Sequence, residues 1–168
     1  GIDLDYETFA FSDGSSSWGA TQPNWTAFVQ ALGAALLAQG KQLAVTVPPP
    51  CNTASVCGPN SGYWVYNIAG IAPAVDRIRI MAYDYSVSGG PIAPLPWVER
   101  VVQHAVSVVP SGKVQIGIPA YGRNATVKVN GVSKVVGTCP TNKPSNYLST
   151  LSFTAADAGT AIPTNDYF

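Results

Sequence analysis

The sequence has few charged residues, and this scarcity excludes several classes of function. Only 11% of its 168 residues are charged, and nine basic side chains balance nine acidic ones. A neutral chain offers no basic surface to attract nucleic acid or an anionic membrane. The uncharged polar composition suits a secreted, extracellular or cell-wall protein that handles neutral polymers, and we expect no nucleic-acid partner.

Long apolar runs and metal ligands are also lacking. The longest apolar candidate, residues 31–38, falls well short of the ~20 residues that span a membrane, and Gly33 interrupts it. No signal peptide is present, which says little because the chain opens inside an expected strand. The only histidine, His104, is far in sequence from all three cysteines, so we predict no metal site.

The sequence lacks the residues that define two common classes of enzyme. No phosphate-cradling glycine loop of nucleotide-binding form is found, and no cofactor is implied. A Ser-His-Asp hydrolase needs a loop histidine beside its nucleophile, whereas His104 lies within an expected amphipathic helix and is predicted to be a surface or structural residue.

The three cysteines point to an oxidising compartment without settling it. Cys51 and Cys57 bracket five residues in a stretch rich in proline, glycine and asparagine, where a small disulfide loop could close. Cys139 is then left over, and it is either free or paired outside this chain.

The sequence opens with seven residues in which apolar and acidic side chains alternate. On a strand, this pattern places Asp3, Asp5 and Glu7 on one face and apolar side chains on the other. Same-face neighbours lie about 7 Å apart, so the charges repel and at least one carboxyl is expected to stay protonated near neutral pH. A protonated carboxyl is what a general acid requires. The alternative is an edge strand with a solvated acidic face.

The rest of the chain to residue 123 alternates strands with helices. This order is typical of right-handed βαβ units and a parallel sheet, whose loops at the carboxyl ends of the strands can build a site. We expect a loop over 9–23 and Asn24 as a helix N-cap. The expected strands are 1–7, 42–47, 77–83 and 113–119, and the expected helices are 24–40, 63–71 and 96–108.

From Asn124 onward the pattern changes. Two alternating runs over 126–136 are joined by Asn130-Gly131, which predicts a two-residue hairpin turn, and a short helix is possible at 155–158. We therefore divide the chain into an α/β domain at 1–123 and a small α+β insertion, or part of one, at 124–168.

Three motifs in this order resemble glycoside hydrolase family 18, the chitinase-like hydrolases. The first seven residues match the last three acids of its D-x-x-D-x-D-x-E signature. The segment from Met81 through Tyr83 to Asp84 resembles its M-x-Y-D segment on the sixth strand. Residues 116–123, which include Tyr121 and Arg123, resemble the G-x-P-x-Y-G-R segment of the seventh strand.

The resemblance implies part of a TIM (β/α)8 barrel, about strands four to seven. Four strands cannot close such a barrel, so we expect the missing strands to be supplied by the rest of a longer parent chain. Because the insertion in that family follows the seventh strand, the predicted hairpin falls where the resemblance places it.

The resemblance also implies roles for the candidate residues. Glu7 would be the proton donor, Asp5 would orient the 2-acetamido group that acts as nucleophile, and Asp3 would share a proton with Asp5. Tyr83 would hydrogen-bond the acetamido group. Residues implied to bind the substrate, an N-acetylglucosamine oligosaccharide or polysaccharide, are Met81, Asp84, Tyr121 and Arg123.

The sequence leaves the roles of further side chains undecided. Arg79 would need an acidic partner inside a barrel, and Asp3 is one candidate. Trp18 and Trp64 either stack on sugar rings or pack against a helix.

We expect a glycosidase that cleaves β-1,4 bonds in chitin or peptidoglycan glycan. The alternatives are a non-catalytic, lectin-like relative and a conventional retaining glycosidase with Asp84 as its nucleophile.

Overall fold

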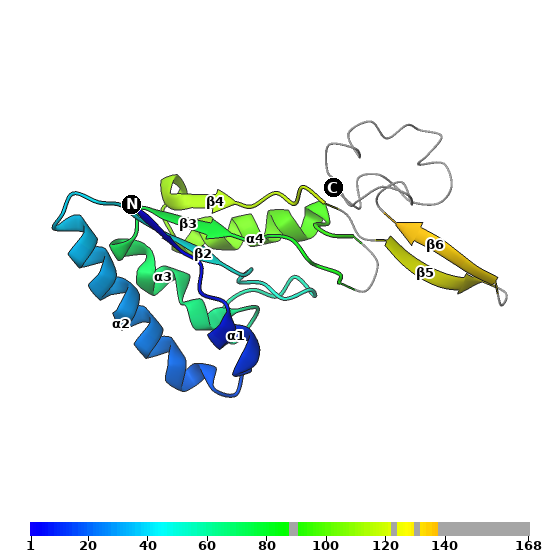
Figure 1. The fold of residues 1–168 in the computed structure, drawn as a ribbon, viewed down its shortest axis with the longest axis horizontal. Helices are drawn as coiled ribbons and strands as arrows, with labels where there is room; N and C mark the ends of the chain where they lie inside the picture. The colour runs from blue at the N-terminus through cyan, green and yellow to red at the C-terminus, as the bar shows by residue number, and fades with distance from the viewer. Residues whose placement is uncertain (88–90, 122–123, 130–131, 138–168) are drawn as a thin grey trace. The chain divides into compact units, whose positions relative to one another are not determined.

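The computed structural model describes residues 1–87, 91–121, 124–129 and 132–137, and the chain divides into two units (Figure 1). The first unit comprises residues 1–82 and 99–117, and the second comprises 83–98 and 118–168.

The first unit contains a sheet of four parallel strands in the order β1-β2-β3-β4. The strands are β1 (Ile2–Leu4), β2 (Leu43–Val47), β3 (Arg77–Ile80) and β4 (Val114–Ile116). Every strand pairs with the next one along the chain, which confirms the predicted succession of βαβ units.

Alternation along the strands divides the sheet into an apolar and a polar face. In β3, Ile78 and Ile80 are buried while Arg77 and Arg79 are exposed, as the period of two requires. In β2, Val45 and its same-face neighbours are fully covered. The helices of the unit pack on this apolar side, and the opposite side carries the polar residues.

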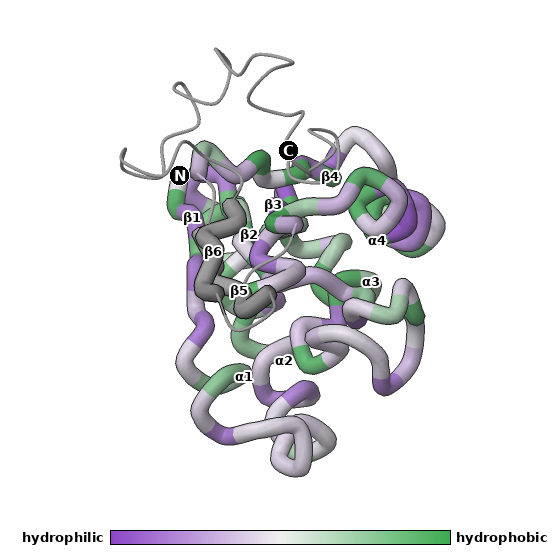
Figure 2. Tube along the Cα trace, turned by 90° about the vertical axis from the view of Figure 1, so that its right-hand side faces the viewer, coloured by the Kyte–Doolittle hydropathy of each residue, from purple (hydrophilic) through white to green (hydrophobic). Residues whose placement is uncertain are grey.

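Helices connect and cover the strands. Their bounds are α1 Thr8–Ser12, α2 Trp18–Leu37, α3 Ile68–Ile71 and α4 Leu95–Val108, with 3-10 turns η1 Trp64–Tyr66, η2 Ala72–Ala74 and η3 Ser111–Lys113. Along α4, hydrophobic and strongly hydrophilic residues alternate (Figure 2). Its buried Val101 and Ala105 are four residues apart on one face, as the predicted amphipathic stripe requires.

The beginning of α2 was wrongly predicted. The helix begins at Trp18 and runs through Pro23, so Asn24 lies inside it and is not an N-cap, while most of the expected loop is helical. Trp18 and Trp25 are two turns apart and both are buried. Extending the helix across an exposed proline buries both indoles, and that packing outweighs the local cost of the missing N–H.

The strands are shorter than predicted. β3 ends at Ile80, after which the Met81 N–H donates to the Val47 carbonyl at 2.9 Å. β2 then enters the prolines at 48–50, which cannot continue a ladder. β1 ends at Leu4 because the chain turns into α1, where the Glu7 carbonyl accepts from the N–H groups of the first turn.

Cys51 and Cys57 form the disulfide that their spacing allows. It closes the loop that follows β2.

The second unit contains the predicted hairpin. β5 (Asn124–Val129) and β6 (Val132–Gly137) are antiparallel, and Val129 pairs with Val132. The turn at 130–131, the expected helix at 155–158 and Cys139 lie outside the described residues. Within the described part of the chain, no helix is both long and apolar enough to cross a membrane.

A glycine in α2 gives a test of this packing. A Cβ on Gly33 would lie 2.1 Å from the backbone oxygen of Ala74, whereas a Cβ on Gly19 meets nothing within 4 Å. Although alanine is the better helix former, we expect Gly33→Ala to lower the free energy of unfolding by about 1–3 kcal/mol through overpacking. Gly19→Ala should leave it unchanged or raise it, and denaturant unfolding of both variants is the measurement. Equal stabilisation by both substitutions would contradict the close approach.

Candidate active site

Two carboxyl side chains meet just beyond the carboxyl end of β1. The segment 5–7 belongs to neither strand nor helix, and Glu7 is the residue that precedes α1. It borders an open hollow of about 430 Å³, a size typical of ligand sites. The hollow is lined by Asp5, Tyr6, Glu7, Thr8, Phe9 and Asp13.

The two carboxyls affect one another. Partial burial raises the pKa of Glu7 above its ordinary value, and the negative charge of Asp5 and a hydrogen bond between the two side chains raise it further. Both groups cannot ionise freely at such close range, so the pair favours a state in which Glu7 keeps a proton. A raised pKa is what a general acid requires.

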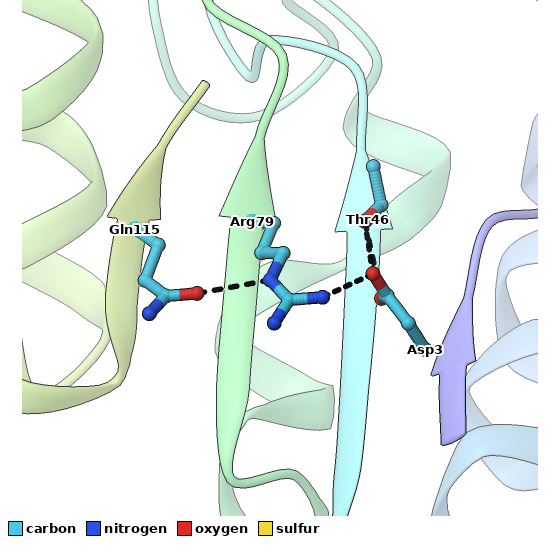
Figure 3. Close-up of polar contacts among 4 residues, drawn as sticks. All are labelled: Asp3, Thr46, Arg79 and Gln115. Atoms are coloured by element: carbon cyan, nitrogen blue, oxygen red, sulfur yellow. Dashed lines mark hydrogen bonds and ion pairs between the residues drawn. The ribbon is translucent and has the colours of Figure 1, made fainter. Parts of the chain in front are cut away.

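Asp3 belongs to a different network on the polar face of the sheet (Figure 3). Arg79 forms an ion pair with Asp3 and donates from Nε to Gln115 Oε1 at 2.9 Å. The hydroxyl of Thr46 also donates to the Asp3 carboxylate, at 3.1 Å. The four side chains come from four adjacent strands, so the network crosses the whole sheet.

This network confirms one sequence prediction and bears on another. Arg79 takes Asp3 as its partner, as predicted. The predicted proton sharing between Asp3 and Asp5 stays a prediction, because the structure ties Asp3 to Arg79 and Thr46 while the carboxyl hydrogen-bonded to Asp5 is that of Glu7.

The structure adds residues that the sequence analysis missed. The Tyr66 hydroxyl donates to the backbone carbonyl of Tyr6, between the two carboxyl-bearing residues, at 2.6 Å. No motif marks Tyr66, which lies in an apolar stretch. Thr46 and Gln115 were detectable, because each is the polar residue at an alternate position of an otherwise apolar strand.

The other predicted site residues divide between the two units. Met81 directly follows β3 in the first unit, whereas Tyr83, Asp84 and Tyr121 belong to the second. Within the second unit the Tyr121 hydroxyl donates to Asp84 at 2.6 Å, and the rings of Tyr83 and Tyr121 meet edge to face. Arg123 lies outside the described residues.

The two tryptophans differ in exposure. Trp18 is buried at the start of α2, where its ring contacts Tyr63 and Trp64, so it packs inside the unit. Trp64 is partly exposed and borders a second hollow of about 360 Å³. His104 on α4 borders the same hollow, and burial, followed by the charge of Arg100, lowers its pKa. The choice between sugar stacking and packing therefore stays open only for Trp64.

Among the residues that the structure describes, no group of three or more histidine, cysteine or carboxylate side chains could hold a metal ion.

Comparison with known proteins establishes the family of the chain. The family described as "Glycosyl hydrolases family 18" matches residues 1–160. The chain belongs to this family. Its resemblance to the chitinase-like hydrolases, inferred from three motifs, is thereby confirmed.

Individual relatives agree with the family assignment. A curated Bacillus subtilis protein named "Putative sporulation-specific glycosylase YdhD" is 30% identical over 73% of this chain and 27% of its own length. A chitinase structure from Chromobacterium violaceum is 33% identical, with a TM-score of 0.63 over 74% of this chain and 37% of that one. The spore cortex-lytic enzyme SleL of Bacillus cereus is 26% identical, with a TM-score of 0.59 over 80% and 30%.

The chain thus spans less than two fifths of the length of each of these proteins. Four parallel strands with helices between them, superposed on proteins of this family, form part of a (β/α)8 barrel. The predicted fold class is confirmed.

The carboxyl pair gives a direct electrostatic test. Asp5→Asn removes the negative charge and the carboxyl hydrogen bond, so the pKa of Glu7 should fall. It should remain above its ordinary value, because burial is the larger cause of the shift and is unchanged. Carboxyl carbon NMR titration, with the signal assigned by Glu7→Gln, measures this pKa. Asp13→Asn is the matched control, since Asp13 lines the same hollow without contributing to the shift. A rise in the Glu7 pKa in Asp5→Asn would contradict this account.

The ion pair on the sheet can be measured separately. A double-mutant cycle of Arg79→Gln with Asp3→Asn should give a coupling energy of about 0.2–1 kcal/mol, the range for exposed pairs, which weakens as salt is added. Arg77 lies on the same strand and face, and its side chain donates to the backbone carbonyl of Asp76. The corresponding cycle with Arg77→Gln should show no coupling, and equal coupling in both cycles would refute a specific pair.

Proposed function

We propose that this chain contributes the acid-bearing part of a glycoside hydrolase that cleaves β-1,4 bonds in polymers containing N-acetylglucosamine. The observation that carries the proposal is the Asp5–Glu7 pair at the carboxyl end of β1, with the pKa of Glu7 raised. That end of the strands is where (β/α)8 barrels carry their active sites.

The geometry of the pair favours a substrate-assisted mechanism. Most glycosidases place two carboxylates on opposite sides of the scissile bond. Asp5 and Glu7 lie two residues apart on one segment and share a hydrogen bond, so they cannot flank a sugar from both faces. We assign the nucleophile to the substrate's own 2-acetamido oxygen, which membership of this family implies.

Each step then has an assigned group. Glu7 gives its proton to the glycosidic oxygen as that bond breaks, while the acetamido oxygen bonds to the anomeric carbon and forms an oxazolinium ion. Asp5 accepts a hydrogen bond from the acetamido N–H and balances the positive charge. The Glu7 carboxylate then takes a proton from the water that attacks the anomeric carbon, and the product keeps its original configuration.

Other residues extend this assignment. We assign Tyr83 to the acetamido group and Met81 to the wall beneath the sugar, while Asp84, Tyr121 and Arg123 bind hydroxyls of neighbouring sugars. The bond between Tyr121 and Asp84 supports a shared role for these two side chains.

The polymer and its location are part of the proposal. The similar proteins are named chitinase in one case and spore cortex-lytic enzyme in another, so chitin and peptidoglycan glycan are the two candidate substrates. The Cys51–Cys57 disulfide supports a secreted or cell-wall location, because such bonds persist in oxidising compartments.

Glu7→Gln tests this function in a barrel-complete polypeptide that carries the chain. The polypeptide should hydrolyse a fluorogenic N-acetylglucosamine oligomer but not the same oligomer without its acetamido groups. Loss of the proton donor should lower kcat at least about a hundredfold. Glu99→Gln is the matched control, because Glu99 lies exposed on α4. Binding without hydrolysis would favour the lectin-like alternative, and equal cleavage of both substrates would exclude substrate assistance.

A further inference from the structure

The segment that carries both carboxyls has little backbone support of its own. Pairing of β1 with β2 ends at Leu4, and the helix that follows begins at Thr8. The Glu7 carbonyl accepts from Ala10 and Phe11 at the start of that helix. The carbonyl of Tyr6 is held instead by a side chain, the Tyr66 hydroxyl, from a residue 60 positions later.

Tyr66 is well placed to hold this peptide rigidly. Its side chain is 1% exposed, and its ring packs against Phe9 and Trp25 with centroids 5.1 and 5.4 Å away. The Trp25 indole N–H also donates to the Tyr66 backbone carbonyl at 3.1 Å. The packing around Tyr66 therefore fixes the position of its hydroxyl in the ligand-free protein, as a preorganised site requires.

The residue after Tyr66 makes a separate contact with α2. Asn67 has a left-handed backbone, with φ 44°, and its side chain accepts from the Gly70 N–H at 3.2 Å. The Asn67 amide also donates to the Thr26 hydroxyl on α2 at 3.0 Å. This contact joins α2 to the residue that follows η1 and does not involve the ring or the hydroxyl of Tyr66.

The phenol stays protonated, and so remains a donor, at neutral and mildly alkaline pH. Burial raises the pKa of Tyr66, and the negative charges of Glu7 and Asp5 raise it further. The bond to the Tyr6 carbonyl consequently persists when the carboxyls ionise.

We propose that Tyr66 is a positioning residue for the acid pair: its hydroxyl holds the peptide between Asp5 and Glu7 and so sets the direction in which both carboxyls point. This role rests on the proposed function of Glu7 as proton donor. Tyr66 itself touches no reacting atom.

Loss of the hydroxyl has a defined electrostatic consequence. Asp5 on the same segment raises the pKa of Glu7, and the charge of Glu7 in turn raises the pKa values of Tyr63 and Tyr66. Asp13 lines the same hollow. If the segment loosens, Asp5 and Glu7 separate and Glu7 becomes more hydrated, so the pKa of Glu7 falls. A general acid must be protonated, so the alkaline limb of the kcat profile moves to lower pH.

The experiment compares Tyr66→Phe with Thr26→Val in the barrel-complete polypeptide. Tyr66→Phe keeps the ring among its aromatic neighbours and deletes only the donor. Thr26→Val removes the hydroxyl that receives the Asn67 amide, so it weakens the same α2–η1 contact without touching residues 5–7. Thermal unfolding of both variants shows that each folds and how much stability each loses.

Kinetics separate positioning from general loosening. In Tyr66→Phe we expect kcat to fall about tenfold to a hundredfold, as for a small misplacement of a reacting group, and the alkaline limb to shift to lower pH. KM should stay within about twofold, because the lost interaction acts in the transition state. Thr26→Val should keep the wild-type kcat and pH profile.

A readout that does not need activity separates this inference from the proposed function. Carboxyl carbon NMR should show the Glu7 pKa falling in Tyr66→Phe and unchanged in Thr26→Val. That result in a polypeptide that hydrolyses nothing would support positioning and refute the hydrolase. Wild-type kcat, pH profile and Glu7 pKa in Tyr66→Phe, beside an inactive Glu7→Gln, would overturn the role of Tyr66 and leave the hydrolase standing.

Discussion

Parallel pairing of neighbouring strands is the constraint on which the rest of this structure depends. Because β1, β2 and β3 run in the same direction, the segments that follow them all leave the sheet at one edge. The acid pair follows β1 at that edge, and Met81 follows β3 there as well. If the strand direction alternated, the segments after β1 and β2 would leave the sheet at opposite edges, and the loops of neighbouring strands could not build one site.

The polar face of the same sheet carries a hydrogen-bond network centred on the ion pair of Arg79 and Asp3. Arg79 neutralises Asp3, and Thr46 and Gln115 supply the remaining hydrogen bonds from the flanking strands. An exposed pair of this kind adds little stability. Its effect is on the distribution of charge, because a neutralised Asp3 leaves Asp5 as the carboxylate that acts on Glu7. Among the three acids of the opening segment, the structure thus pairs Asp3 with Arg79 and leaves Asp5 and Glu7 beside one another.

Much of this site was accessible from residue patterns. The period of two in the opening segment placed Asp3, Asp5 and Glu7 on one face, but the structure brings together only Asp5 and Glu7 of these and ties Asp3 to Arg79. Three ordered motifs identified the family. The sequence also indicated that Arg79 would need an acidic partner inside a barrel, with Asp3 as one candidate. The errors came where distant packing overrode local preference: a loop to Pro23 and an N-cap at Asn24 were expected, yet burial of Trp18 and Trp25 carries α2 across both residues. β3 ends earlier than its hydrophobicity predicts, because the prolines that follow β2 offer it no partner beyond Val47.

The sequence by itself determined the order of strands and helices, the alternation of faces and the presence of the acids, because these depend on local periodicity and on motif spacing. Only the tertiary structure decided how the acids are held. The bond from Tyr66 to the Tyr6 carbonyl joins positions 60 residues apart. No period or motif encodes that contact, since it arises when α2 and η1 pack together and leave one phenol facing an otherwise unsupported peptide.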